Sequence, residues 1–145
     1  DHPDLGFPCY RKLSKLEVND LCQEILRSHG LPIDTSAWQL PTQIRKRSMI
    51  VRETSVLDCR LDLINLLEHR LGLSVSRRDQ FYVNWDNFDN VDLFPNCEFF
   101  QWLHYIWYPS SDDIEIIPQS KAWILSIDHD GFLYIMQHSA KSASA

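Results

Sequence analysis

The stretch from Asn84 to Asp92 holds the most unusual polar residues in the chain and is the first candidate for chemistry. It reads Asn-Trp-Asp, Asn-Phe-Asp, Asn-Val-Asp, so an amide and a carboxylate each recur at every third residue. A calcium ion needs about six or more oxygen ligands, which loops usually supply from alternating positions. The spacing of three, with no following glycine and no suitably placed bidentate glutamate, does not favour a metal site. We therefore expect no metal here.

Asp128-His129-Asp130-Gly131 is a second candidate, because it places a histidine between two carboxylates. Neighbouring residues of a tight hairpin point in divergent directions, and aspartate and glycine are ordinary turn residues. Cys97 and His104 would lie two turns apart on a helix, too far for a nucleophile and its base. The chain has only 4 glycines, too few for a phosphate-binding loop. We expect no catalytic residue and no cofactor.

Charge is distributed unevenly over the 145 residues, whose formal net charge is −6. Residues 1–79 carry 12 basic and 11 acidic side chains, whereas residues 80–145 carry 2 basic and 9 acidic ones. The second part also holds 14 of the 17 aromatic residues. An acidic, aromatic half repels phosphate backbones and attracts basic partners.

A small basic cluster in the first half is the one feature that could favour nucleic acid. It would have to align with Arg77 and Arg78 to follow a phosphate backbone. In an acidic chain, a solvated basic face is the simpler interpretation, so nucleic-acid binding is not expected. The cluster consists of Arg45, Lys46, Arg47 and Arg52.

Two helices are predicted in the first half. Ser14-Lys15-Leu16-Glu17 is a capping box, and apolar residues follow at helical spacing as far as Gly30. A leucine-rich helix begins at Thr54 or Ser55 and ends at Gly72. Residues 31–53 are open between helix, strand and loop. Trp38 and Leu40 in that segment are expected to face inward.

The second half predicts strands around a third helix. Residues 80–85 have the composition of a strand, and the repeat that follows is expected to form a turn or short helix. A helix is expected from 96 to 107 and a short strand at 114–117. Residues 122–127 and 132–136 are expected to form a hairpin.

The predicted fold class is α+β, with a single globular domain over residues 1–138. Two N-terminal helices and the third helix are expected to pack with a small antiparallel sheet that ends in the C-terminal β-hairpin. Residues 139–145 are rich in serine and alanine and are expected to form a disordered tail.

The cysteines and the N-terminal residues favour a cytoplasmic protein. No two cysteines form a C-x-x-C pair, and we interpret them as buried, reduced thiols. The start of the sequence has no basic segment followed by an apolar one, which predicts no signal peptide. No apolar run approaches the length of about 20 residues that a membrane helix needs, so no membrane partner is expected. The cysteines are Cys9, Cys22, Cys59 and Cys97.

Function is predicted from the acidic, aromatic half. Aromatic rings supply contact area and carboxylates steer a basic protein toward them. We therefore expect a small, non-catalytic interaction protein, comparable in charge and size to antitoxins and immunity proteins. The simpler interpretation is a surface turn that apolar residues anchor to the core. The residues expected to bind the partner are Trp85, Asp86, Phe88, Asp89, Asp92, Asp112 and Asp113.

The alternative function is a small-ligand-binding protein or an enzyme. Its pocket would lie between the third helix and the C-terminal hairpin. A deep, enclosed pocket with converging polar groups would favour this alternative. The sequence also leaves open a homo-oligomer, such as a homodimer, formed through the surplus aromatic residues. The expected pocket residues are Trp102, Trp107, Trp123 and Tyr134.

Overall fold

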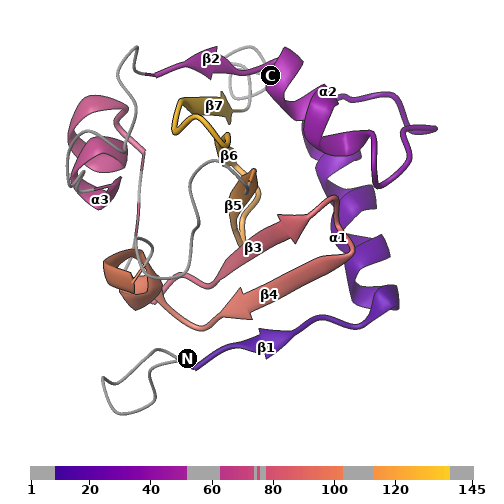
Figure 1. Cartoon of the computed structure of the whole chain (residues 1–145), viewed down its shortest axis with the longest axis horizontal. Helices are drawn as coiled ribbons and strands as arrows, with labels where there is room; N and C mark the ends of the chain where they lie inside the picture. The colour runs from indigo at the N-terminus through magenta and orange to yellow at the C-terminus, as the bar shows by residue number, and fades with distance from the viewer. Residues whose placement is uncertain (1–8, 52–62, 74, 76–77, 103–112, 138–145) are drawn as a thin grey trace.

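The fold is built on an antiparallel sheet of seven strands (Figure 1). The structure is a computed structural model that describes residues 9–51, 63–73, 75, 78–102 and 113–137. The strands lie in the order β1-β4-β3-β5-β6-β7-β2, and every pair of neighbours is antiparallel. They are β1 (Arg11–Lys12), β2 (Met49–Ile50), β3 (Phe81–Asp86), β4 (Asn90–Phe94), β5 (Ile114–Pro118), β6 (Trp123–Ile127) and β7 (Leu133–Gln137).

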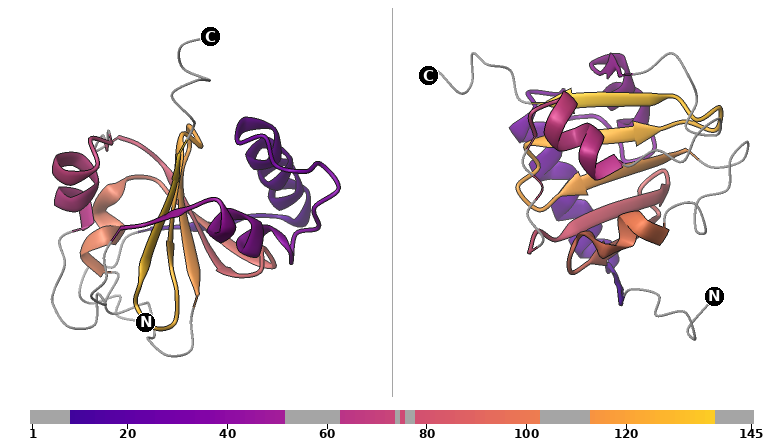
Figure 2. Two further views of the ribbon diagram at one scale, coloured as in Figure 1. Left: turned by 90° about the horizontal axis from the view of Figure 1, so that it is seen from above. Right: turned by 90° about the vertical axis from the view of Figure 1, so that its left-hand side faces the viewer.

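Helices lie against both faces of this sheet. They are α1 (Lys15–Ser28), α2 (Leu40–Lys46), α3 (Leu63–Asn65), the π-helical turn η3 (Leu66–Arg70) and the 3-10 helix η4 (Cys97–Trp102). α1 and α2 cover one face, and α3 and η4 cover the other (Figure 2, left). The chain begins at one edge with β1, crosses the first face through α1 and α2, and reaches the opposite edge with β2. The N-terminal segments therefore flank the sheet that the C-terminal half forms.

The predicted architecture, a small sheet ending in a C-terminal hairpin, is wrong. β6 and β7 do pair with each other, but they belong to a sheet of seven strands. β1 and β2 have two residues each, too few to show an alternating pattern. β4 begins inside the Asn-x-Asp repeat, which was expected to form a turn or short helix.

Parts of the predicted elements lie outside the described residues. The leucine-rich helix is described from Leu63 onward, so its expected start at Thr54 or Ser55 lies outside. The third helix is described only as η4, because residues 103–112 lie outside. The tail predicted at 139–145 also lies outside.

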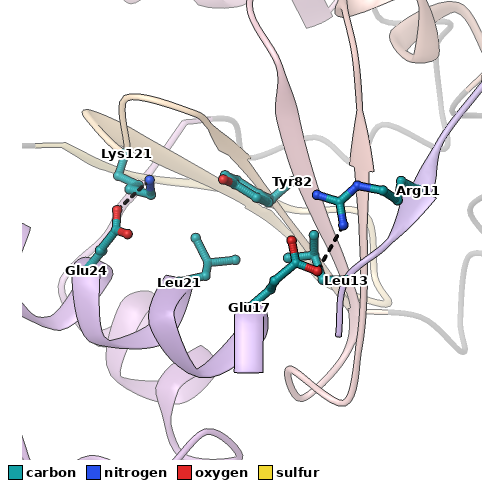
Figure 3. A pocket seen from close by; sticks show the side chains of 7 residues that line it. All are labelled: Arg11, Leu13, Glu17, Leu21, Glu24, Tyr82 and Lys121. Carbon is teal, nitrogen blue, oxygen red and sulfur yellow. Dashed lines mark hydrogen bonds and ion pairs between the residues drawn. The ribbon is translucent and has the colours of Figure 1, made fainter. Parts of the chain in front are cut away.

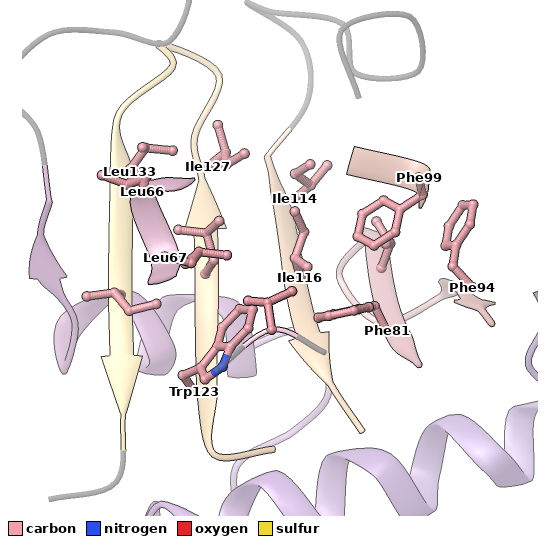
Figure 4. Close-up of a cluster of buried hydrophobic side chains, with 14 residues drawn as sticks. Leu66, Leu67, Phe81, Phe94, Phe99, Ile114, Ile116, Trp123, Ile127 and Leu133 are labelled. Atoms are coloured by element: carbon pink, nitrogen blue, oxygen red, sulfur yellow. The ribbon is translucent and has the colours of Figure 1, made fainter. Parts of the chain in front are cut away.

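The core consists of two apolar clusters, one on each face of the sheet. Both faces are covered, so β5 and β6 are buried along their whole length and read as apolar runs. The cluster under η3 and η4 holds most of the buried aromatic rings (Figure 4). Phe94 and Phe99 stack with their ring centroids 4.8 Å apart, and Phe81 and Trp123 lie 6.2 Å apart. Four aromatic residues of the second half, Phe81, Phe94, Phe99 and Trp123, thus form part of this core cluster.

The helix α1 begins and ends where the sequence predicts. The Ser14 hydroxyl accepts the Glu17 backbone N–H at 3.2 Å, and the Glu17 carboxylate accepts the Ser14 N–H at 3.0 Å. Gly30 follows the helix with a φ of 64°, a left-handed conformation that glycine adopts without strain. The connection to α2 departs from expectation. Leu40 is buried, but Trp38 is 68% exposed, so the expectation that it faces inward is wrong.

The capping box predicts a specific dependence of stability on pH. Hydrogen bonds from Arg11 and from the Ser14 backbone lower the pKa of Glu17 from 4.5 to about 2. Because the folded-state pKa is lowered, the stabilisation is complete above pH 4.5 and is lost as the pH falls toward 2. Urea unfolding should therefore show that Glu17→Gln is less stable than wild type at neutral pH, with the difference disappearing over that range.

The matched variant is Arg11→Gln, which removes the first of these hydrogen bonds. It should shift the loss of stabilisation toward the ordinary pKa of Glu17. A difference between wild type and Glu17→Gln that stays constant down to the lowest pH would contradict this account of the helix start.

Candidate functional site at the acidic end of the sheet

One end of the sheet brings together carboxylates from three segments of the chain. Asn84 near the end of β3 lies opposite Glu115 of β5, which lies opposite Ser126 of β6. The β3–β4 turn, the start of β5 and the β6–β7 turn therefore lie at the same end (Figure 2, right). We call the following set of carboxylates the acidic end: Asp89 in the β3–β4 turn, Asp113 before β5, and Asp128 and Asp130 in the β6–β7 turn.

A buried polar row crosses the sheet beside the acidic end. Strand register places Asn84, Glu115, Ser126 and Tyr134 next to one another. Along each strand they alternate with apolar residues of the cluster under η3 and η4. They therefore lie on the other face of the sheet, which α1 and α2 cover. A row of polar side chains inside an apolar layer needs partners, because an unpaired buried polar group costs about 1–3 kcal/mol.

The carboxylate of Glu115 is the charged member of this row and is only 1% exposed. Asn84 donates from Nδ2 to Oε1 of Glu115 at 2.6 Å. Oε2 has no hydrogen bond within the described residues and lies 3.5 Å from Nη2 of Arg45 in α2. Burial raises the pKa of Glu115, while Asn84 and then Arg45 act in the opposite direction.

Arg45 joins the buried row to the acidic end. Its Nη2 lies 3.6 Å from Oδ2 of Asp113 as well as close to Glu115. One guanidinium thus faces two carboxylates, one buried and one at the surface. The C-terminal turn of α2 is held to the sheet by this contact. Because Arg45 also serves Glu115, it offsets only part of the negative charge of the acidic end.

His129 lies among the carboxylates of this end. Asp113 Oδ1 accepts the backbone N–H of His129 at 2.6 Å and lies 3.0 Å from its ring Nδ1. The ring Nε2 lies 3.6 Å from Oδ2 of Asp130. The hydrogen bond to Asp113, followed by the charge of Asp130, raises the pKa of His129 above 6.5. The neighbouring carboxylates therefore favour the protonated form of this exposed imidazole.

Asp128 organises the β6–β7 turn. Its Oδ1 accepts the backbone N–H groups of Asp130 and Phe132, both at 3.0 Å. Its Oδ2 accepts the hydroxyl of Tyr134 at 3.0 Å. Burial, and then the contact with Asp128, raise the pKa of Tyr134. These bonds all lie within the turn and the start of β7, so Asp128 has a structural role and the backbone that carries Asp130 is held in place.

The Asn-x-Asp repeat forms the turn of the β3–β4 hairpin and the adjoining strand ends, and the two aromatic side chains of the repeat act as anchors. Trp85 lies half-buried on the η4 face, where its Nε1 donates to Oδ2 of Asp92 at 2.9 Å. Burial raises the pKa of Asp92, and the hydrogen bond from Trp85 offsets part of this increase. Phe88 is buried in the cluster beneath α1 and α2. Trp85 and Phe88 therefore fit the simpler interpretation, in which apolar residues anchor a turn to the core.

Backbone strain in this hairpin is offset by the same contacts. Asn87 and Phe88 have φ values of 44° and 61°, which are unusual for residues other than glycine. Such a conformation costs roughly 1–2 kcal/mol per residue. Asn84 Oδ1 accepts the Phe88 N–H at 2.8 Å, and burial of the phenyl ring contributes about 1.5–3 kcal/mol. Asn84 therefore stabilises both the turn and Glu115.

The remaining residues predicted to bind a partner are divided. Asp89 is exposed in the hairpin turn, and Asp113 is 38% exposed at the start of β5, so the structure brings these two to one end. Asp112 and the side chain of Asp86 lie outside the described residues. Asp92 is engaged by Trp85 on the η4 face.

The two described side chains of the alternative pocket lie on opposite faces of the sheet. Trp123 is buried in the aromatic cluster on the η4 face. Tyr134 alternates with the residues of that cluster on β7 and therefore faces the opposite side, where it bonds Asp128. Trp107 and the side chain of Trp102 lie outside the described residues.

Glu115 was expected, with Asp112 and Asp113, to extend an acidic surface patch, but it is buried, and its pairing with Arg45 was not predicted from the sequence. Glu115 carries a usable signal, because it is a single carboxylate inside the apolar run Ile114–Ile117. A charge in such a run must find a partner. Nothing in the sequence names Arg45 as that partner, since it lies 70 positions earlier within a basic cluster.

A separate small cavity lies between α1 and the sheet (Figure 3). It measures about 150 Å³ and is flanked by two ion pairs, Lys121 to Glu24 at 2.6 Å and Arg11 to Glu17 at 2.9 Å. Tyr82 lies between them, with the Lys121 ammonium 5.5 Å from its ring centroid. Each cation already faces a carboxylate, so this cavity serves the docking of α1 on the sheet.

Comparison with known protein families, with characterised proteins and with solved structures finds no match to this chain. Within the described ranges, no three His, Cys, Asp or Glu side chains are arranged to hold a metal ion. None of the helices in those ranges has the length and apolar character that crossing a membrane requires.

Removing the Asn84 side chain tests its double role. Asn84→Ala removes the hydrogen-bond donor to Glu115 Oε1 and the side-chain acceptor of the Phe88 N–H. We expect it to lower the free energy of unfolding by roughly 2–4 kcal/mol, measured by urea denaturation. Asn90→Ala, in the same hairpin, is the control and should change stability by about 0.5 kcal/mol or less. Equal effects of the two variants would show that the bonds of Asn84 do not matter.

The raised pKa of Glu115 predicts the opposite pH dependence to that of Glu17. The folded state holds the proton more tightly than the unfolded chain, so protonation removes the cost of the buried charge. Relative to Glu115→Gln, wild type should gain stability as the pH falls through the raised pKa toward the ordinary value of 4.5. Thermal melts over this range measure the difference, and a flat difference would mean that Glu115 titrates as an ordinary carboxylate.

Proposed function

We propose that the chain is a non-catalytic interaction protein that binds a basic protein partner through the acidic end of the sheet. Antitoxins and immunity proteins that neutralise basic toxins act in this way. The observation that supports the proposal is the gathering of exposed carboxylates from three segments at one end. Within the described residues, these carboxylates form ion pairs only with Arg45 and His129. Arg45 also faces Glu115, so negative charge remains for a partner.

The acidic end is held in position before any partner arrives. Asp113 is fixed by its bonds to His129, and the turn that carries Asp130 is fixed by Asp128. A preorganised surface loses little conformational freedom on binding, which favours affinity. The net charge of −6 adds long-range attraction, which accelerates association with a basic protein.

A cytoplasmic location is part of the same proposal. Cys22 of α1 is a free, buried thiol, and burial raises its pKa to about 11. Such a thiol is unreactive and suits a reducing compartment. Cys9 is also free but is exposed, unlike the interior position that the sequence predicts for the cysteines.

The test compares two triple variants that change the net charge equally, from −6 to −3. Asp89→Asn/Asp113→Asn/Asp130→Asn alters the acidic end. Asp20→Asn/Glu68→Gln/Glu98→Gln removes three exposed acids elsewhere. Proteins captured from a lysate of the source organism on immobilised wild type are identified, and the binding of each purified partner is then measured by biolayer interferometry.

The acidic-end variant should slow association with a basic partner by about tenfold or more, because steering charges act mainly on the association rate. The control variant should retain most of the wild-type rate, and the wild-type rate should fall as salt is added. Circular dichroism checks that both variants are folded. Equal loss in the two variants, or binding without salt dependence, would show that the acidic end is not the contact surface.

A further inference from the structure

Trp38 is the feature that neither the core nor the acidic end explains. This residue is 68% exposed in the connection between α1 and α2. This connection is held by its own hydrogen bonds, from Thr35 N–H to the Pro32 carbonyl at 3.1 Å and from Ser36 N–H to Gln39 Oε1 at 3.1 Å. The indole is thus presented to solvent by an ordered backbone, and its large apolar surface adds little to the core.

A cavity of about 400 Å³ opens beside this indole. Small-ligand sites measure about 300–1,000 Å³ and combine aromatic surface with a few polar groups. Apart from Trp38, the polar residues that line the cavity include Asp34, Gln39, Thr42 and Gln43. The cavity therefore has the size and the mixed lining of a ligand site.

The polar groups of the cavity have hydrogen-bonding capacity to spare. Within the described residues, the side chains of Asp34, Thr42 and Gln43 have no hydrogen-bond partner. Gln39 uses only its Oε1, so its amide hydrogens remain for a ligand. Together these groups offer a carboxylate acceptor, a hydroxyl and two amides next to one flat apolar ring.

The charge of the lining selects among ligand classes. No lysine, arginine or histidine lines the cavity, and Asp34 would repel an anion, so phosphates and carboxylates have no counter-charge there. A sugar ring fits both halves of the site, because its C–H face can cover the indole while its hydroxyls bond the carboxylate and the amides. We propose that this cavity binds a neutral sugar, with the sugar ring stacked on Trp38.

This site is independent of the proposed partner surface. The sugar site lies at the start of α2 and in the preceding loop, whereas the acidic end meets α2 near its last residues through Arg45. None of the variants used to test partner binding alters the residues of this cavity. Failure of one proposal therefore leaves the other standing.

The test is an NMR titration of the whole chain with glucose, galactose, N-acetylglucosamine and cellobiose. The indole N–H signal of Trp38 is assigned from its absence in Trp38→Phe. At least one sugar should shift this signal saturably. Gln43→Ala and Asp34→Asn should each weaken binding by about tenfold, equivalent to about 1.4 kcal/mol. Trp38→Ala should abolish saturation transfer from the protein to the sugar.

The control variant is Leu16→Ala, which truncates a side chain that is 73% exposed on α1. It should bind sugar as wild type does, because it removes exposed apolar surface away from the cavity. Adenosine is included because a flat base could also stack on an indole. A shift with adenosine but with none of the sugars, no shift at all, or unchanged sugar binding in Trp38→Ala and Gln43→Ala would each overturn the proposal.

Discussion

The buried carboxylate of Glu115 is the constraint on which the arrangement around the sheet end depends. An ion removed from water costs several kcal/mol unless opposite charge and hydrogen bonds replace the solvent. Asn84 and Arg45 provide these, and each has a second task. Asn84 also holds the strained turn at Phe88, and Arg45 also faces Asp113. A single interior charge thus connects α2, the β3–β4 hairpin and the start of β5.

The position of Arg45 has a direct consequence for recognition. Because it faces the interior carboxylate as well as Asp113, the exposed acids beyond it keep an excess of negative charge. Several aromatic rings of the same half lie inside the molecule, as Phe81, Phe94 and Phe99 do. Among the described residues, the exposed carboxylates of the acidic end and the exposed Trp38 lie in different places.

Some features of the fold and site follow from short-range patterns and could be predicted. The capping box at Ser14 starts α1, and a strand was expected up to Trp85, one residue short of the end of β3. Asp89 and Asp113 were selected as binding candidates, and the structure places both at one end. Other features could not be predicted, because β1 and β2 are too short for a periodic signal and Arg45 reaches Glu115 across a long stretch of chain.

The sequence by itself determined local conformation and the overall balance of charge. Capping groups, turn residues and apolar runs act over a few positions, and the acidic character of residues 80–145 is a matter of composition. Only the tertiary structure decided the seven-stranded order, the pairing of Glu115 with Asn84 and Arg45, and the exposure of Trp38. These features depend on which distant segments of the chain meet. Strand register brings those segments together through backbone hydrogen bonds, and these bonds leave no local signal in the sequence.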